Sequence, residues 1–231
     1  VGAGTFLAEI SKSNPNLDLK FIGSDISVNV LEEAFINSLV NVPNLKLMLG
    51  DSTKQKPLSA KPSHVVSELP LGMRMPFQRL KNDETTKNFS HRDGSVRIIE
   101  NSIESISDNG KGFFITTPST LVKNTKEITI FRKLLVEKDY IRSIINLPPG
   151  ALGPLTRIPA IVMILDKNKK PQYKDKFQVI SISEKNHFKK TEDFLNDETI
   201  ELIVKEFNNY TFSLNSEIIT KDEVVDNNFV I

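Results

Sequence analysis

Three short stretches in the first fifty-two residues place glycine or acidic residues where apolar runs end or where a helix would begin. They are Gly2-Ala3-Gly4, Gly23-Ser24-Asp25 and Gly50-Asp51-Ser52. Residues 19–26 and 45–49 read as strands, and residues 28–39 between them have the apolar spacing of a half-buried helix. Carboxyl ends of parallel strands meet at one edge of a sheet, which is where α/β proteins bind ligands. We therefore expect an α/β protein with these polar groups gathered at one sheet edge.

The first of these stretches is typical of a ligand-binding turn. Two glycines one residue apart allow a tight turn and a close approach of the backbone to a ligand. Residues 5–10 then have the pattern of a helix opening, and free amides at such an end favour anionic or polar groups. A plain strand-to-helix turn explains the same residues. The strand that should precede the turn is not in the sequence, which begins at Val1, so we expect that strand to lie upstream.

Asp25 stands at the position where nucleotide-binding folds place a ribose-binding acid. It follows Gly4 by 21 residues, close to the usual separation in nucleotide-binding βαβ units. A solvated acid at the end of a strand is the alternative interpretation.

The rest of the chain continues the alternation of strands and helices. We predict helices at residues 96–106, 127–137 and 197–208 and a short terminal helix after the capping box Thr220-Lys221-Asp222-Glu223. Strands are predicted at residues 63–67, 113–117, 140–147, 158–165 and 177–182. No crossover helix fits between residues 147 and 158, so those two strands should pair antiparallel. The fold class is a doubly wound, mostly parallel α/β sheet with one antiparallel strand. We divide the chain into residues 1–167, a catalytic domain lacking its first strand, and 168–231, a C-terminal extension.

Composition excludes several kinds of site. The 231 residues contain no cysteine, which rules out disulfides and thiolate metal sites. The three histidines, at positions 64, 91 and 187, have no metal-ligand spacing, so we predict no metal site. No apolar run is long enough to cross a membrane. A formal net charge of +1 is not that of a self-sufficient DNA-binding protein.

A basic segment without periodicity occupies residues 73–93. Basic residues interleaved with aromatic ones suit a loop that faces nucleic acid, although a solvated surface loop fits as well. The residues concerned are Arg74, Phe77, Arg79, Lys81, Lys87, Phe89, His91 and Arg92.

The order of these motifs resembles the catalytic domain of adenine-N6 DNA methyltransferases, and is most similar to the modification subunit of type I restriction-modification systems. Residues 2–7 resemble the S-adenosylmethionine loop, and residues 65–72 stand where that family has its catalytic Asn-Pro-Pro-Phe/Tyr. Residues 110–121, 131–150, 158–167 and 197–231 extend the similarity over nearly the whole chain. The resemblance implies a Rossmann-like class I methyltransferase fold.

The resemblance also implies the residues that would bind S-adenosylmethionine. Asp25 matches the acid for the ribose hydroxyls, Ile26 would flank the adenine, and Asp51 with its neighbours would recognise the adenine amine. The implied cofactor-binding set is Gly2, Gly4, Thr5, Phe6, Asp25, Ile26, Asp51 and Ser52.

The catalytic motif departs from the family at three positions. The implied catalytic residues are Glu68, Leu69, Pro70 and Leu71, where the family has Asn, Pro, Pro and an aromatic residue. Glu68 keeps an acceptor for the target amine but brings a charge that is costly to desolvate. Leu71 cannot stack on a flipped base, and such stacking is worth about 1–3 kcal/mol. Methyl transfer to adenine could therefore be impaired.

Three functions remain open from the sequence. The first is S-adenosylmethionine-dependent methylation of adenine N6 in DNA within a restriction-modification system. The others are a catalytically inert scaffold that binds cofactor or DNA, and a methyltransferase with another substrate. By the resemblance we expect DNA to be reached through a separate specificity subunit in a hetero-oligomer, and the protein to be cytoplasmic.

Overall fold

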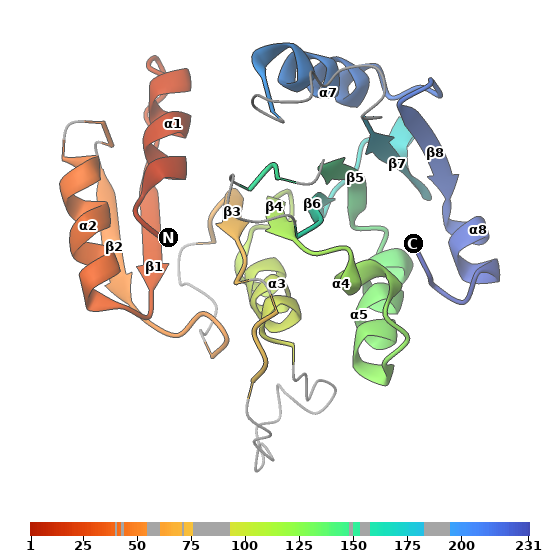
Figure 1. Ribbon diagram of the computed structural model, residues 1–231, viewed down its shortest axis with the longest axis horizontal. Coiled ribbons are helices and arrows are strands. Elements are labelled where there is room, and N and C mark those ends of the chain that lie inside the picture. Colours follow the sequence, from red (N-terminus) through yellow and green to blue (C-terminus); the bar gives the residue numbers. More distant parts are fainter. Residues whose placement is uncertain are drawn as a thin grey trace. The chain divides into compact units, whose positions relative to one another are not determined.

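The computed structural model of the protein describes residues 1–39, 41–42, 44–54, 61–70, 72–75, 93–147, 150–152, 158–182 and 195–231. The chain forms two compact units, Val1–Pro57 and Leu58–Ile231. Figure 1 shows the first unit in red and orange and the second in yellow through blue.

The first unit is a β-α-β arrangement that begins with a further helix. Its elements are α1 (Thr5–Ser13), β1 (Phe21–Asp25), α2 (Val28–Ser38) and β2 (Leu45–Leu49). The two strands are parallel, in a register that runs from Phe21 opposite Leu45 to Asp25 opposite Leu49. Helix α2 contacts both strands and α1. The predicted strand–helix–strand alternation is thus confirmed in this unit.

Local residues explain where α2 begins and which side it buries. The hydroxyl of Ser27 accepts a hydrogen bond from the backbone N–H of Val30, which caps the helix. Ala34 and Ser38 are buried on its inner side, one helical turn apart. A small residue at position 34 lets the turn before α1 approach the α2 backbone closely.

The second unit contains a six-stranded mixed sheet in the order β3-β4-β6-β5-β7-β8. The strands are β3 (His64–Glu68), β4 (Lys111–Thr116), β5 (Ile141–Leu147), β6 (Ala160–Asp166), β7 (Lys176–Ser181) and β8 (Ser216–Thr220). The helices are α3 (Gly94–Ser105), α4 (Ser119–Val122), α5 (Lys126–Glu137), the 3-10 turn η2 (Pro171–Tyr173), α7 (Asp197–Asn209) and α8 (Lys221–Asp226).

Strand β6 lies between β4 and β5 and is antiparallel to both. This confirms the prediction drawn from the short connection before it. Six of its seven residues are buried, as expected for an apolar strand covered on both faces. Since β3 is parallel to β4 and β5 is parallel to β7, the strands β3, β4, β5 and β7 end at the same edge of the sheet.

Two apolar cores cover the two faces of this sheet. Side chains of α3, α4 and α5 pack on one face around Phe114, Phe131 and Met163, all fully buried. Helix α7 packs on the other face against Ile145, Ile164, Ile180 and Ile182. Figure 1 shows α7 on one side of the strands and α3 and α5 on the other. The α/β class predicted from the sequence is therefore confirmed.

The sheet holds a second antiparallel strand, β8, where one antiparallel strand was predicted. It pairs with β7, from Lys176 opposite Thr220 to Ile180 opposite Ser216. Its five residues lack the alternation that identifies a strand in sequence, so the pattern of residues 216–220 did not indicate its pairing with β7. Thus β7 and β8, from the predicted extension, continue the sheet of the preceding residues. The predicted capping box at Thr220 and Glu223 opens α8.

Candidate functional site

The glycine turn at the start of the first unit has the backbone conformation that only glycine adopts without strain. Gly2 has φ +56° and Gly4 has φ +80°, and Gly4 is the N-cap of α1. A Cβ atom on Gly4 would lie 3.3 Å from the carbonyl oxygen of Ala34. Asn37 of α2 donates a 3.0 Å hydrogen bond to the Ala3 carbonyl. Helix α2 therefore holds the turn in place. Because the N-cap residue Gly4 has no side chain, it cannot cap the first amides of α1.

Asp25 is joined to this turn by a hydrogen bond that its carboxylate accepts. Its Oδ2 accepts a 3.2 Å hydrogen bond from the backbone N–H of Gly2, and its Oδ1 accepts one of 3.0 Å from Ser27. The backbone nitrogen of Val1 donates to the carbonyl oxygen of Ser24 at 2.6 Å, so the chain at Val1 runs beside the end of β1. Burial alone would raise the pKa of Asp25, but the N–H groups of Ser27 and Gly2, together with the amino group of Val1, outweigh it and lower that pKa.

Asp51 lies beside Asp25 at the same end of the two strands. The backbone N–H of Gly50 donates to the Asp25 carbonyl at 2.9 Å, which joins the ends of β1 and β2. Thr53 donates both its N–H (3.0 Å) and its hydroxyl (2.6 Å) to Asp51 Oδ1, and Lys54 lies 3.2 Å from Oδ2. Burial alone would raise the pKa of Asp51, but these contacts lower it, so the carboxylate is ionised at neutral pH.

The remaining predicted cofactor residues line the same end of the first unit with accessible side chains. Ile26 is 71% exposed and Phe6 is 41% exposed. Thr5, in the first turn of α1, is exposed, and Ser52 follows Asp51 in the turn after β2. Ile26 follows Asp25, the last residue of β1, directly in sequence, so an exposed apolar side chain stands next to the acid along the chain.

The predicted catalytic motif begins at the carboxyl end of β3. Glu68 is the last residue of that strand and is exposed. Leu69 is buried, and its N–H donates to the Ile115 carbonyl of β4 at 2.9 Å. The carbonyl of Pro70 accepts a 3.0 Å hydrogen bond from the hydroxyl of Ser95. Gly72 has φ +74°, a left-handed backbone conformation that glycine adopts without strain. Leu71 lies outside the described residues.

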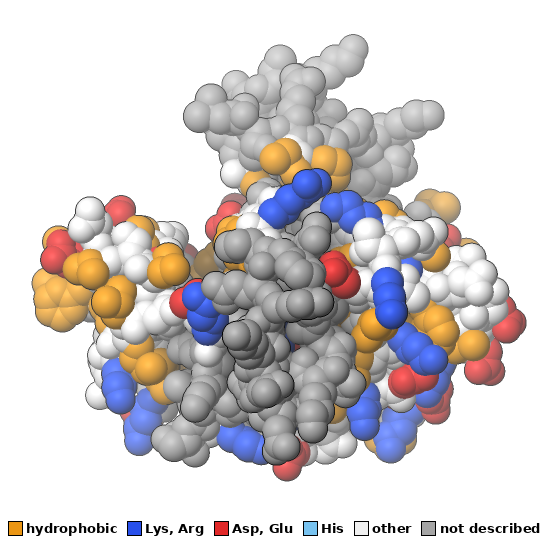
Figure 2. Space-filling model, turned by 90° about the horizontal axis from the view of Figure 1, so that it is seen from below, with side chains coloured by type: hydrophobic (Ala, Val, Ile, Leu, Met, Phe, Trp, Pro, Cys, Tyr) orange, Lys and Arg blue, Asp and Glu red, His pale blue; other side chains and the backbone are white. Residues whose placement is uncertain are grey.

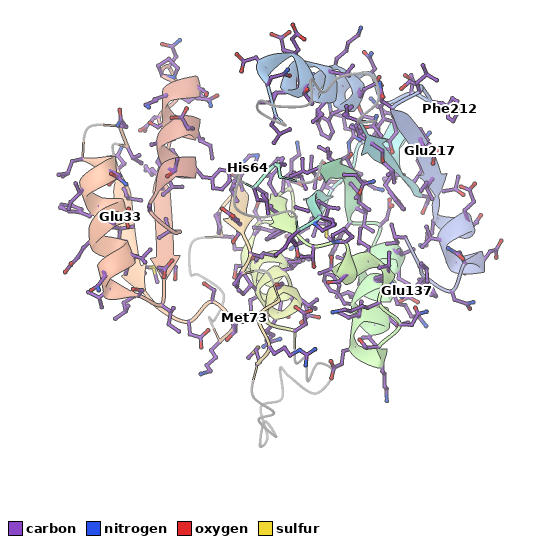
Figure 3. All side chains as sticks on the ribbon, viewed as in Figure 1. Glu33, His64, Met73, Glu137, Phe212 and Glu217 are labelled. Atoms are coloured by element: carbon purple, nitrogen blue, oxygen red, sulfur yellow. The ribbon has the colours of Figure 1, made fainter. Side chains whose placement is uncertain are left out.

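The basic segment is described only at its two ends. Arg74 forms an isolated antiparallel bridge with Asp93, the N-cap of α3. The other predicted basic and aromatic residues of this segment lie outside the described residues. Figure 3 labels Met73 at the start of this segment.

Within the described ranges, no group of three or more His, Asp or Glu side chains is placed to hold a metal ion. Among those same residues, no helix has both the length and the apolar composition needed to cross a membrane.

Three residues that support the candidate site were not predicted. Ser27 and Thr53 each donate to the acid two positions earlier, and the short patterns Asp25-Ile26-Ser27 and Asp51-Ser52-Thr53 could have indicated these turns. Ser95 contacts a residue 25 positions away, which no local pattern indicates.

The fold has counterparts among solved structures. A methyltransferase subunit of a type I restriction-modification system from Streptococcus thermophilus superposes with a TM-score of 0.85 at 19% identity over 99% of this chain. The M protein of the type I restriction enzyme EcoKI gives 0.67 at 15% identity over 98% of this chain. A Listeria monocytogenes protein, whose name assigns it to the class I S-adenosylmethionine-dependent methyltransferases, gives 0.60 at 18% identity over 90%. At these identities the likeness shows the fold, which is the one predicted.

This chain spans 51%, 58% and 62% of the length of those three proteins. Comparison with curated protein sequences gives no match. The family model described as N-6 DNA Methylase matches residues 1–231. The chain belongs to the N-6 DNA methylase family.

Proposed function

We propose that this chain forms the catalytic part of an S-adenosylmethionine-dependent methyltransferase that acts on adenine N6 in DNA. The observation that carries the proposal is the junction of Gly2, Asp25 and Gly50. It brings three separate predicted cofactor segments to one end of β1 and β2 through two hydrogen bonds, of 3.2 and 2.9 Å. Membership of the N-6 DNA methylase family supports the reaction.

The groups at this end of the first unit fit the chemistry of S-adenosylmethionine. Each carboxylate oxygen of Asp25 can accept more than one hydrogen bond, so ribose hydroxyls can join the N–H groups of Gly2 and Ser27. The exposed side chain of Ile26 offers an apolar surface to an adenine ring. The uncapped amides of α1 favour the cofactor's carboxylate. Asp51 can accept from the adenine amine through Oδ2, whose partner Lys54 is exposed.

When bound, the cofactor supplies a methyl group on a sulfonium, and transfer then requires a positioned amine. We assign the positioning of that amine to Glu68 and Leu69. The Glu68 carboxylate is an exposed acceptor at the end of β3. The side chain of Leu69 is buried, and the N–H of Leu69 donates to β4. The carbonyl of Leu69 receives no hydrogen bond from the described residues. A target amine could donate one N–H to each of these acceptors. Holding reactants in this way can supply much of the rate.

The partners that we propose are DNA and a separate specificity subunit in a cytoplasmic hetero-oligomer. Two of the structural relatives are subunits of type I restriction-modification enzymes. The chain's net charge of +1 gives it little general attraction for phosphates, so another subunit would supply most of the DNA affinity.

The function is tested with the native polypeptide, both alone and in complex with the proposed specificity subunit. Calorimetry measures binding of S-adenosylmethionine, and transfer of a labelled methyl group is measured on DNA containing adenine or N6-methyladenine at the target. The expected result is cofactor binding with transfer only to unmethylated adenine. Absence of cofactor binding would overturn the proposal.

A second candidate is an inert relative that binds cofactor without transferring the methyl group. The observation that favours it is the charged Glu68 at the place of the family's asparagine. A carboxylate that enters a closed pocket loses solvation, which costs several kcal/mol unless it is paired. Cofactor binding without transfer to DNA, RNA or free nucleoside would support this alternative. Transfer to RNA or nucleoside alone would indicate a different substrate.

A further inference from the structure

The predicted catalytic turn is held by a side chain from outside the motif. The hydroxyl of Ser95 donates a 3.0 Å hydrogen bond to the Pro70 carbonyl, across 25 positions of sequence. Ser95 is in the first turn of α3 and is only 4% exposed. Among the described residues, this is the only side-chain hydrogen bond to residues 68–70 and 72. Because a hydrogen bond has a preferred geometry, a buried hydroxyl that donates to one carbonyl restricts the orientation of that carbonyl.

Ser95 is free to hold Pro70 because another residue caps the helix. Serine near a helix start commonly satisfies the first backbone N–H groups. Here the carboxylate of Asp93 accepts from the N–H groups of Ser95 and Val96, at 3.0 and 3.3 Å. The Ser95 hydroxyl is thus directed away from its own helix and towards the turn.

Further contacts join the same two segments. The N–H of Gly94 donates to the Met73 carbonyl at 3.0 Å, and the backbones of Arg74 and Asp93 form an isolated antiparallel β-bridge. A Cβ on Gly94 would lie 2.0 Å from Cε of Met73, so the end of the Met73 side chain would have to move to admit one. The start of α3 is therefore joined to Pro70, Met73 and Arg74, and the Ser95 hydroxyl supplies the contact nearest the motif.

We propose that Ser95 is a positioning residue for methyl transfer. By holding the Pro70 carbonyl, it fixes the adjoining Leu69–Pro70 peptide, whose carbonyl is one of the two acceptors for the target amine. The other side of that peptide is fixed by the hydrogen bond from Leu69 N–H to Ile115. This role rests on the proposed function. It needs no contact between Ser95 and the substrate.

The helix itself supplies a matched control. The hydroxyl of Ser102 donates to the Ile98 carbonyl, one turn back on α3, at 2.7 Å. Ser102→Ala removes a partly buried hydroxyl from the same helix without touching the turn. Ser95→Ala removes the bond to Pro70, and Ser95→Thr retains a hydroxyl there.

The experiment compares these variants in the native polypeptide and complex. For Ser95→Ala we expect kcat to fall about 10- to 100-fold, since small displacements in a site have effects of this size, while KM for S-adenosylmethionine stays unchanged. Ser95→Thr should restore most of kcat, and Ser102→Ala should match the parent protein. Amide hydrogen exchange at Leu69, Gly72 and Met73 should accelerate only in Ser95→Ala, and this readout does not require transfer.

The outcomes separate the two proposals. An unchanged kcat and unchanged exchange in Ser95→Ala, with an active parent protein, would overturn the role of Ser95 alone. Equal losses in Ser95→Ala and Ser102→Ala would indicate general damage to α3 and would also overturn it. If neither the parent protein nor the variant Glu68→Asn with Leu71→Phe transfers a methyl group, the proposed function is overturned, and the role of Ser95 with it.

Discussion

Gly50 donates its backbone N–H to the carbonyl oxygen of Asp25 at 2.9 Å, which joins the ends of β1 and β2 where both predicted cofactor acids lie. The Asp25 side chain in turn accepts from Gly2. One acid thus contacts the glycine turn through its side chain and the second strand through its backbone. These two hydrogen bonds link the three segments.

Gly4→Ala should destabilise the first unit. The residue would have to adopt φ +80°, and its Cβ would lie 3.3 Å from the Ala34 carbonyl. We expect the free energy of unfolding to fall by about 1–3 kcal/mol. Gly50→Ala is the control, because Gly50 is not in the left-handed region and its nearest neighbour, Ser24 Oγ, would be 3.6 Å away. Urea denaturation measures both variants, and equal stabilities would contradict the packing at Gly4.

Asp25→Ala should weaken S-adenosylmethionine binding. A charge-assisted hydrogen bond to the ribose would be lost, which corresponds to about 1–3 kcal/mol by calorimetry. Because Asp25 also holds Gly2 and Ser27, the denaturation curve of the same variant must be measured. Glu9→Ala, which changes an exposed acid on α1, should bind like the parent protein. Equal affinities for Asp25→Ala and the parent would remove Asp25 from the site.

Glu68→Asn combined with Leu71→Phe should raise methyl transfer to adenine. The amide is an uncharged acceptor, and the ring can stack on a flipped base, worth about 1–3 kcal/mol. Leu69 could limit the gain, because the family's proline there fixes the backbone angle. The assay uses labelled cofactor, with the specificity partner present. Strong transfer by the parent protein, lost in the double variant, would instead make Glu68 and Leu71 a working form of the site.

Arg142→Ala should loosen α7 from the sheet. Its guanidinium carbon lies 3.7 Å from the ring centroid of Tyr173, 4.1 Å from that of Tyr210 and 4.8 Å from that of Phe207. Arg142 is only 6% exposed, and its loss should reduce the free energy of unfolding by about 2–4 kcal/mol. Arg142→Lys keeps the charge but not the flat stack, so an intermediate value is expected. A fully stable Arg142→Ala would show that the aromatic cage contributes nothing.

Tyr210 should make the stability of the protein fall at high pH. Burial raises the pKa of Tyr210 to about 12, from an ordinary value of 10.0. Because the folded pKa is the higher one, the neutral phenol stabilises the fold below pH 10.0, and that stabilisation is lost as the pH rises towards 12. Tyr210→Phe lacks this titration. Its stability relative to the parent should therefore improve between pH 9 and pH 11, and a constant difference would contradict the burial of the phenol.

The local patterns of the chain were sufficient to predict most of its elements and one important pairing. The apolar run that became β6 has no room for a crossover before it, and this alone requires an antiparallel partner. The alternation of strands and helices in the first fifty-two residues predicted that the polar groups at the strand ends would gather at one sheet edge, and the hydrogen bonds from Gly2 and Gly50 to Asp25 agree with this. The predicted division at residues 167 and 168 and the roles of the cofactor residues stay predictions.

Tertiary structure alone decided the contacts between residues far apart in sequence. Strand β8 is ordered by β7, which lies 35 or more positions earlier. Arg142 is the residue at which the pairing of β5 with β6 changes register, and such an irregularity can redirect a side chain, here against the rings of η2 and α7. Ser95 reaches Pro70 only because α3 begins beside the turn. Sequence periodicity records which side of an element is apolar, whereas these contacts depend on which elements become neighbours once the core has packed.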